Sequence, residues 1–128
     1  MKLLLDTHVL LWIAVDSPRL SPAARRLLTR AGTELTFSAA SVWEVAIKDR
    51  RGRDDFQVDA AVLRRALVDQ GYTELPVTGA HAVAVSGLPA RHKDPFDRLL
   101  LAQAVVEGMT LVTADETLAS YPGPVRKV

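Results

Sequence analysis

The sequence predicts a single α/β domain with a parallel sheet of four to five strands and helices on both faces. Short apolar segments alternate with segments of helical length, which is typical of βαβ units with parallel strands. No repeat, low-complexity tract or linker divides the 128 residues, so we expect one domain. Hydrophobic residues make up 48% of the chain and aromatic residues only 5%, which suits a core of leucine, valine and alanine between helices and a sheet.

The first half of the chain predicts two strands, each followed by helical segments. KLLLD is an apolar run stopped by an acid, as expected for a central strand covered on both faces. Ser21 as N-cap and Pro22 at the first helical position begin the second helix. ELTFS has the length and composition of a second strand, and Gly52 ends the helix after it. These elements are expected at residues 2–6 (strand), 7–15 and 21–32 (helices), 34–38 (strand) and 39–52 (helix).

The second half repeats the alternation after the polar stretch GRDDFQV. Asp59 and Thr78 are suited to cap two helices, and Gly71 and Gly108 are suited to stop two. TELPV and MTLVTAD are the third and fourth apolar runs of strand length. These elements are expected at residues 60–71 (helix), 73–77 (strand), 79–87 and 95–108 (helices) and 109–115 (strand), followed by a short helical turn and an extended piece at 123–128.

Composition excludes several classes of protein. The absence of cysteine rules out a disulfide framework and a thiolate metal site, and it fits a reducing compartment. The N-terminal MKLLLDTHVLLWIAV superficially resembles a signal peptide, but Asp6 and His8 interrupt its apolar stretch. No uninterrupted apolar stretch approaches the roughly 18 residues that a membrane span needs. We therefore expect a cytoplasmic protein without membrane contact.

Acids from four separate segments are predicted to lie at one edge of the sheet. Asp6 ends the first strand, Asp115 follows the fourth, Asp97 begins the helix before the fourth, and Glu44 lies early in the helix after the second. Ligands of open α/β sheets bind beyond the carboxyl ends of the strands, which is this edge. Clustered carboxylates repel one another unless cations are present, and Mg²⁺ and Mn²⁺ prefer carboxylate oxygen. The pattern predicts a divalent-metal site.

Each acid also has a purely structural interpretation. Asp94 and the proline after it form a favourable helix start, with Asp97 in the first turn. Glu44 could form an exposed pair with Lys48 four residues later. Asp6 and Asp115 could be helix caps as well. We expect Asp97 to bind metal, and Asp94 to cap the helix and to be a further candidate ligand through water.

Neither His8 nor His81 is expected to have a catalytic role. His8 follows Asp6 closely, but its spacing fits no metal-ligand motif and it could face the helix interior. His81 lies in an apolar helix and is expected in the core or at the surface.

Four sequence blocks are similar, in order and spacing, to those of PIN-domain ribonucleases, especially the VapC-type toxins of bacterial toxin–antitoxin pairs. The blocks are LLLDTHVLLW, SAASVWEVAIK, HKDPFDRLLLAQA and LVTAD. The resemblance covers essentially the whole chain and implies one PIN domain over residues 1–128. It implies an Mg²⁺- or Mn²⁺-dependent ribonuclease and does not identify the RNA. Its acidic quartet falls on Asp6, Glu44, Asp97 and Asp115, with Asp94 as a further acid and Thr113 as an auxiliary hydroxyl.

Partners are predicted from charge, from apolar surface and from the resemblance. The run KDRRGR carries four cations; such runs are usually solvated, but this one could hold RNA phosphates through Arg50, Arg51 and Arg53. The resemblance implies a small antitoxin. Leu10, Leu11 and Trp12 are consecutive and spread over roughly 200° of helix, so we expect a homodimer or an antitoxin helix to cover part of them. The alternative is a third packing layer within the monomer, with the helix at 21–31 covering Trp12.

The sequence leaves two other functions open. A phosphorylated receiver domain has a similar size, but TELPV lacks a terminal phosphoacceptor aspartate and Asp6 lacks an adjacent second acid. A PIN-like RNA-binding module without catalytic activity is the other alternative, and the intact acidic set argues against it.

Overall fold

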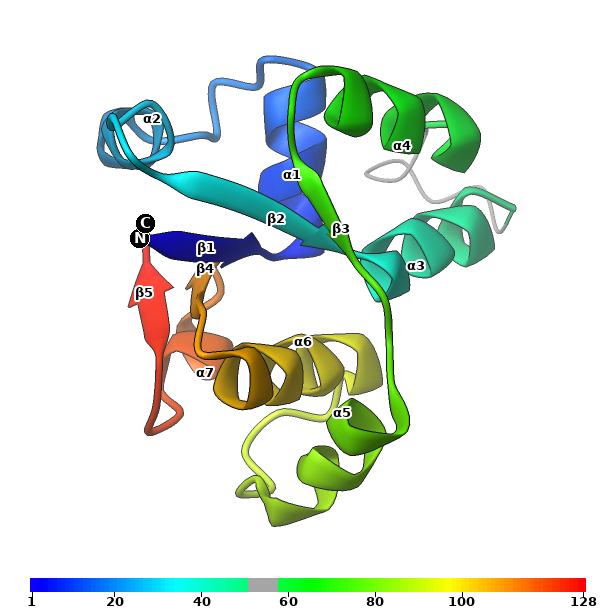
Figure 1. The fold of residues 1–128 in the computed structure, drawn as a ribbon, viewed down its shortest axis with the longest axis vertical. Coiled ribbons are helices and arrows are strands. Elements are labelled where there is room, and N and C mark those ends of the chain that lie inside the picture. Colours follow the sequence, from blue (N-terminus) through cyan, green and yellow to red (C-terminus); the bar gives the residue numbers. More distant parts are fainter. Residues whose placement is uncertain (51–57) are drawn as a thin grey trace.

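The computed structural model describes residues 1–50 and 58–128. Within them, five strands form one parallel sheet in the order β3–β2–β1–β4–β5, with β1 at its centre (Figure 1). The strands are β1 (Lys2–Leu5), β2 (Glu34–Ser38), β3 (Thr73–Leu75), β4 (Thr110–Thr113) and β5 (Val125–Lys127). The predicted α/β class with a parallel sheet is confirmed, and the extended piece at the C-terminus is the fifth strand.

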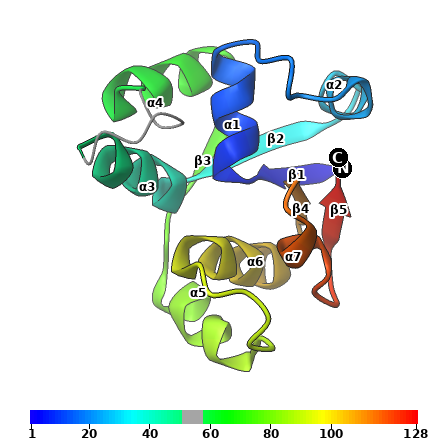
Figure 2. The same cartoon turned by 180° about the vertical axis from the view of Figure 1, so that it is seen from behind.

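Helices cover both faces of the sheet, as predicted. Helices α1, α2 and α4 lie on one side, and α5, α6 and α7 lie on the other (Figures 1 and 2). Helix α3 begins directly after β2, at the carboxyl edge. The helices are α1 (Thr7–Ala14), α2 (Pro22–Leu28), α3 (Ala39–Arg50), α4 (Ala60–Asp69), α5 (Gly79–Ala84), α6 (Pro95–Glu107) and α7 (Glu116–Ala119), with a 3₁₀ turn at Val85–Gly87.

The central strand explains why two cores form. Successive side chains of a strand point to opposite faces, so Leu3 and Leu5 join the cluster under α1, α2 and α4, whereas Leu4 joins the cluster under α6 and α7. All three leucines are fully buried. The apolar run that predicted a strand covered on both faces therefore serves both cores.

Several predicted boundaries were too generous. Strand β3 ends at Leu75 instead of residue 77, because Pro76 has no N–H to continue the ladder. Helix α2 ends at Leu28, short of the predicted Gly32 stop. The helix predicted over 79–87 ends at Ala84 and tightens into the 3₁₀ turn. The last part of the helix predicted to Gly52 lies outside the described residues.

Much of the apolar surface of α1 is covered by other helices of the chain. Leu10 and Leu11 are buried in the same core cluster as Ala24 and Leu27 of α2, and Trp12 packs against that cluster. The other helices therefore account for Leu10 and Leu11, whereas Trp12 is only partly buried, so a partner chain on this surface stays a prediction. Among the described residues, no helix is both long enough and apolar enough to cross a bilayer.

Candidate metal centre

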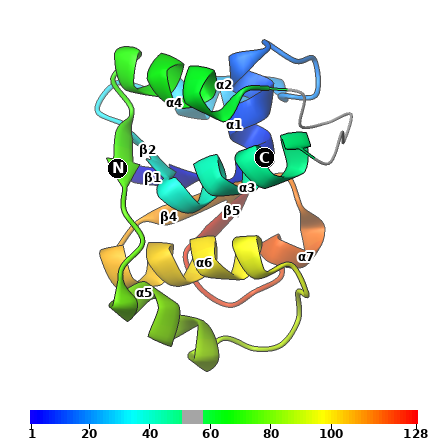
Figure 3. The same ribbon diagram turned by 90° about the vertical axis from the view of Figure 1, so that its right-hand side faces the viewer.

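The acids predicted from the sequence meet at the carboxyl edge of the sheet, which faces the viewer in Figure 3. Asp6 follows β1 and Asp115 lies two residues beyond β4, the neighbouring strand. Asp94 and Asp97 lie at the start of α6, and Glu44 lies in the second turn of α3. Parallel strands bring these distant segments together because their carboxyl ends share one edge.

Asp6 is fixed by two hydrogen bonds in a buried position. Its side chain is 4% exposed, and Oδ1 accepts from the Val9 N–H at 2.9 Å as the N-cap of α1. Its Oδ2 accepts from the Thr113 hydroxyl, and Thr113 Oγ1 accepts in turn from the Asp115 N–H at 3.0 Å. Burial raises the pKa of Asp6, although the hydrogen bonds to Thr113 and Val9 oppose the rise. The capping interpretation is correct, but it uses only one oxygen.

Asp97 lies where the negative charge is concentrated. Burial raises its pKa to about 8, and the charges of Asp94, Asp6, Glu44 and Asp115 add to the rise in that order. Four acids from separate segments therefore lie near enough to Asp97 to act on its charge. A divalent cation would relieve both the desolvation and the repulsion.

Glu44 is buried, contrary to the solvent-exposed interpretation. Its side chain is only 2% exposed, and Oε2 pairs with Lys48 Nζ at 2.5 Å. The pair therefore exists, but α3 packs against α1 and α6, which turns this polar stripe inward. The other oxygen, Oε1, is buried without a hydrogen-bond partner. An orphaned buried carboxylate oxygen is costly, which fits a ligand atom for a metal ion.

Asp94 caps α6, as expected. Its Oδ1 accepts from the N–H groups of Phe96 and Asp97 at 2.8 and 3.2 Å. Its charge nevertheless contributes to the raised pKa of Asp97, so it lies close enough to influence a bound cation.

His92 is a member of this cluster that the sequence analysis missed. Its Nε2 lies 3.0 Å from Asp97 Oδ2 and 3.6 Å from Asp115 Oδ2, within ion-pair distance but without hydrogen-bond alignment. Its Nδ1 accepts from the Asp94 N–H at 3.1 Å, which leaves the ring proton on Nε2. The Tyr121 hydroxyl accepts from the His92 N–H at 2.7 Å and anchors the loop. The available signal was its place two residues before Asp94, in the run ARHKD.

His92, Asp97 and Asp115 offer ligand atoms within 4.8 Å of one another. The protonated Nε2 nevertheless argues against His92 as a ligand, because a metal needs the lone pair on that atom. The remaining donors are carboxylate oxygens, which suit hard ions such as Mg²⁺ and Mn²⁺. The residues present therefore fit a divalent-metal centre.

A recess of about 260 Å³ opens beside Asp6 and Asp115. His8, Trp12 and Arg19 also line it, and the rings of His8 and Trp12 lie 6.2 Å apart. His8 therefore faces this recess and not the helix interior.

Other sequence candidates fall outside the centre. His81 is fully buried and bonds to Thr78 and Glu107, as the core interpretation expected. Arg51 and Arg53 lie outside the described residues, as does the side chain of Arg50, so their predicted phosphate contacts stay a prediction.

Comparison with known proteins identifies relatives of the whole chain. The family model described as PIN domain matches residues 3–124. Ribonuclease VapC22 of Mycobacterium tuberculosis is 33% identical over 122 residues, covering 94% of this chain and 92% of that protein.

Two solved structures share the fold at low sequence identity. VapBC2 from Rickettsia felis, bound to a promoter DNA fragment, superposes with a TM-score of 0.73 at 14% identity, over 99% of this chain and 98% of that one. DNA-bound VapBC from Salmonella typhimurium gives a TM-score of 0.70 at 16% identity, with the same shares covered.

Proposed function

The chain belongs to the PIN-domain family, and we propose that it is a divalent-metal-dependent ribonuclease that acts as the toxin of a toxin–antitoxin pair. The observation that carries the proposal is the buried, unpartnered Oε1 of Glu44 close to Asp97, whose pKa is raised by burial and by four neighbouring acids. Helix capping alone does not account for burying several mutually repelling carboxylates, one of them with an unpartnered oxygen. A site that binds a divalent cation needs such a cluster of carboxylates, because the cation offsets their repulsion.

We assign the metal-holding role to four carboxylates, with a fifth acting through water. The four are Asp6, Glu44, Asp97 and Asp115, and the fifth is Asp94. A bound Mg²⁺ or Mn²⁺ would neutralise phosphate charge and supply an activated water for hydrolysis of the phosphodiester bond. Thr113 holds the Asp6 carboxylate and the Asp115 backbone in place.

Two cationic or proton-bearing groups complete the centre. Lys48 offsets part of the charge of Glu44, and His92 presents its Nε2 proton between Asp97 and Asp115. We propose that this proton stabilises negative charge on the phosphate oxygens during cleavage. His92 would then act on the substrate without binding the metal.

The substrate and partner follow from the relatives and from charge. One relative is named a ribonuclease and two structural neighbours are VapBC complexes, which supports RNA as substrate and a small antitoxin as partner. An antitoxin Arg or Lys placed among the acids would replace the metal charge and inhibit the enzyme. Arg50, Arg51 and Arg53 would contact RNA phosphates. A cytoplasmic location and a homodimer belong to the same proposal.

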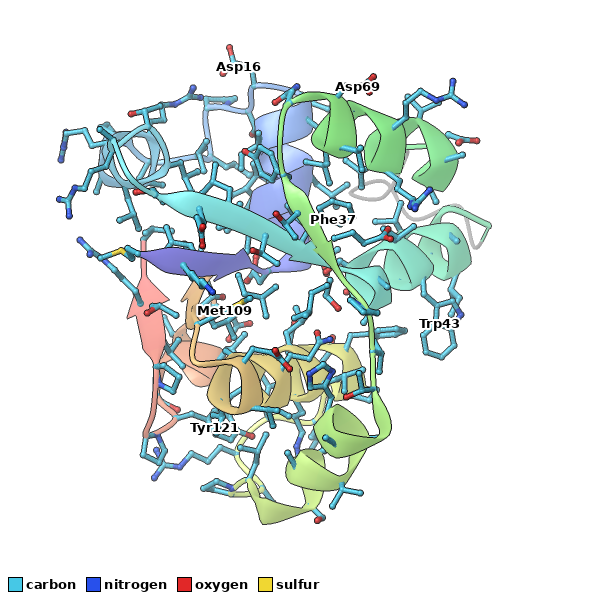
Figure 4. The ribbon with its side chains drawn as sticks, in the orientation of Figure 1. Asp16, Phe37, Trp43, Asp69, Met109 and Tyr121 are labelled. Carbon is cyan, nitrogen blue, oxygen red and sulfur yellow. The ribbon has the colours of Figure 1, made fainter. Side chains whose placement is uncertain are left out.

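A nuclease assay tests the proposal directly. The purified chain should cleave structured RNAs with Mg²⁺ or Mn²⁺ and lose activity in EDTA. Asp97→Asn should lower kcat at least about 100-fold, because loss of a ligand should cost no less than loss of an outer-shell partner, which costs about 10- to 100-fold. Asp69→Asn removes an exposed acid at the C-terminal end of α4, labelled in Figure 4, that is not part of the acidic cluster, and should be neutral. RNA binding without cleavage under any of these metals would favour the inactive-module alternative.

The partner is tested separately. The product of the adjacent reading frame should bind the chain and suppress cleavage in a titration. Light scattering of the chain alone gives its oligomeric state. A product that binds without changing the cleavage rate would contradict the inhibitory role.

A further inference from the structure

One large aromatic side chain beside the metal centre faces solvent. Trp43 is 60% exposed and extends outward from α3 (Figure 4), although it directly precedes the buried Glu44. Among the described residues, the other exposed large hydrophobic side chains are Met1, Val15, Val62, Val68, Val77, Val83, Val105 and Val106. Within residues 1–50 and 58–128, Trp43 is therefore the one aromatic side chain among the exposed large hydrophobic residues.

The exposed indole is held in place by a second ring. Trp43 and Phe96 make an edge-to-face contact with ring centroids 5.2 Å apart and planes at 68°. Phe96 directly precedes Asp97 in the first turn of α6. Each ring is thus adjacent in sequence to a proposed metal ligand, and the pair joins α3 to α6 beside the acids.

A cation lies next to the same pair. Lys48 Nζ, which bonds to Glu44, lies 6.0 Å from the centroid of the Phe96 ring. The surface beside the metal centre therefore combines a flat apolar face with a nearby positive charge. A nucleotide has the complementary combination of an aromatic base and a phosphate.

We propose that Trp43, supported by Phe96, is a stacking platform for one unpaired nucleobase of the RNA next to the cleaved phosphate. This proposal deepens the proposed function and rests on it. Base–aromatic stacking tolerates every base, because each base has a π-face. The platform should therefore prefer single-stranded over double-stranded RNA without preferring a particular base. A duplex already stacks both faces of its bases, so the substrate class is RNA that is single-stranded at this nucleotide.

A protein partner fits the platform less well. A stable protein interface buries about 800 Å² on each side, which one indole and a half-buried phenyl ring do not supply. The other exposed hydrophobic residues are spread over different elements, with Val62 and Val68 on α4, across the sheet from α6. The acids beside the two rings further limit the apolar area available to a protein partner. A single nucleobase, by contrast, can stack on the face of the Trp43 ring alone.

Cleavage kinetics with matched variants test the platform. Trp43→Ala should raise KM for a single-stranded RNA of about 12 nucleotides roughly 5- to 150-fold, the range found for loss of one stacked base. It should change kcat less than KM and leave the melting temperature nearly unchanged, since the side chain is exposed. Trp43→Phe should restore most of the affinity, because it keeps a ring. Val83→Ala, at a more exposed site on α5, is the control and should match the wild type.

An abasic scan links the variant to one nucleotide. Removing the base at a single position near the cleaved bond should weaken binding to the wild type but not weaken binding to Trp43→Ala any further, because the two changes remove the same contact. If the losses in binding from the abasic nucleotide and from Trp43→Ala add at every position, the platform is overturned. A KM of Trp43→Ala equal to that of the wild type would overturn it as well.

Indole fluorescence separates this proposal from the nuclease assignment. In the Asp97→Asn background, the single-stranded RNA should quench the emission, and Trp43→Phe should remove most of that quenching while Trp12 remains. If the wild type cleaves RNA but no quenching depends on Trp43, the platform fails and the ribonuclease assignment stands. If no RNA is cleaved yet quenching depends on Trp43, the platform stands and the nuclease assignment fails. Loss of self-association or of antitoxin binding in Trp43→Ala, with RNA affinity intact, would make the rings a protein interface and overturn the proposal.

Discussion

The Thr113 hydroxyl donates a hydrogen bond to Asp6 although the two residues lie 107 positions apart in the chain. Strands β1 and β4 are parallel neighbours with Leu5 paired to Val112, so the residues that follow these two meet at the same edge. The hydroxyl also accepts the Asp115 N–H. A single threonine therefore orients two proposed metal ligands from different strands.

Replacing Thr113 by valine should weaken metal binding while preserving the shape of the core. The loss of an orienting hydrogen bond to a ligand lowers metal affinity about 10- to 100-fold in other sites. Titration calorimetry with Mn²⁺ measures this directly. Thr113→Ser keeps the hydroxyl and should stay close to the wild type. Equal Mn²⁺ affinity in the valine and serine variants would show that the hydroxyl does not position Asp6.

Metal binding should raise the melting temperature. A cation relieves carboxylate repulsion only in the folded state, so saturation at 100 times Kd would add about 2.7 kcal/mol to the free energy of unfolding. Asp97→Asn should lose most of this gain, whereas Asp69→Asn should keep it. Scanning calorimetry with and without Mn²⁺ provides the measurement. If the wild type melts at the same temperature in both conditions, the acids do not form a shared metal site.

Stability without metal should fall as the pH rises between 3.8 and about 8. Asp97 ionises near 3.8 in the unfolded chain but retains its proton up to about 8 in the folded protein. The folded state then binds more protons over this window, and the free energy of unfolding decreases with pH. The raised pKa of Asp6 acts in the same direction.

Asp97→Asn removes its share of that dependence. In EDTA, the melting temperature of the variant should exceed that of the wild type by an amount that increases as the pH rises from 3.8 to about 8. Near pH 3.8 the two melting temperatures should differ little. Metal competes with the same proton, so the Mn²⁺-induced stabilisation of the wild type should grow with pH. Parallel pH profiles for the two proteins would contradict the pKa assigned to Asp97.

His92→Ala should separate a proton donor from a metal ligand. Because Nδ1 accepts the Asp94 N–H, Nε2 carries the proton, and we expect Mn²⁺ affinity to change little. The rate constant kcat should fall about 100-fold or more, as for the loss of a group that stabilises the transition state by proton donation. Mn²⁺ titration and cleavage kinetics on one preparation decide between the roles. A large drop in Mn²⁺ affinity would identify His92 as a ligand.

Local signals were sufficient for most of the secondary structure. The caps at Ser21, Asp59, Thr78 and Asp94 all accept the expected backbone N–H groups, because a cap is decided within a few residues. Boundaries were less accurate where tertiary contacts or a missing donor intervene, as at the early end of β3 before Pro76. The parallel sheet followed from the alternation of strands and helices.

What the sequence by itself determined was the set of acids and the edge of the sheet on which they lie, because strand ends and helix starts are local features. Only the tertiary structure decided their environments. Packing of α3 against α6 buries Glu44 and leaves Oε1 without a partner, and the hydroxyl of Tyr121 fixes the loop that brings His92 to Asp97. The helices around α1 likewise cover apolar residues that looked available to a partner. Burial, charge density and tautomer depend on contacts between residues far apart in the chain, and a one-dimensional pattern does not contain those contacts.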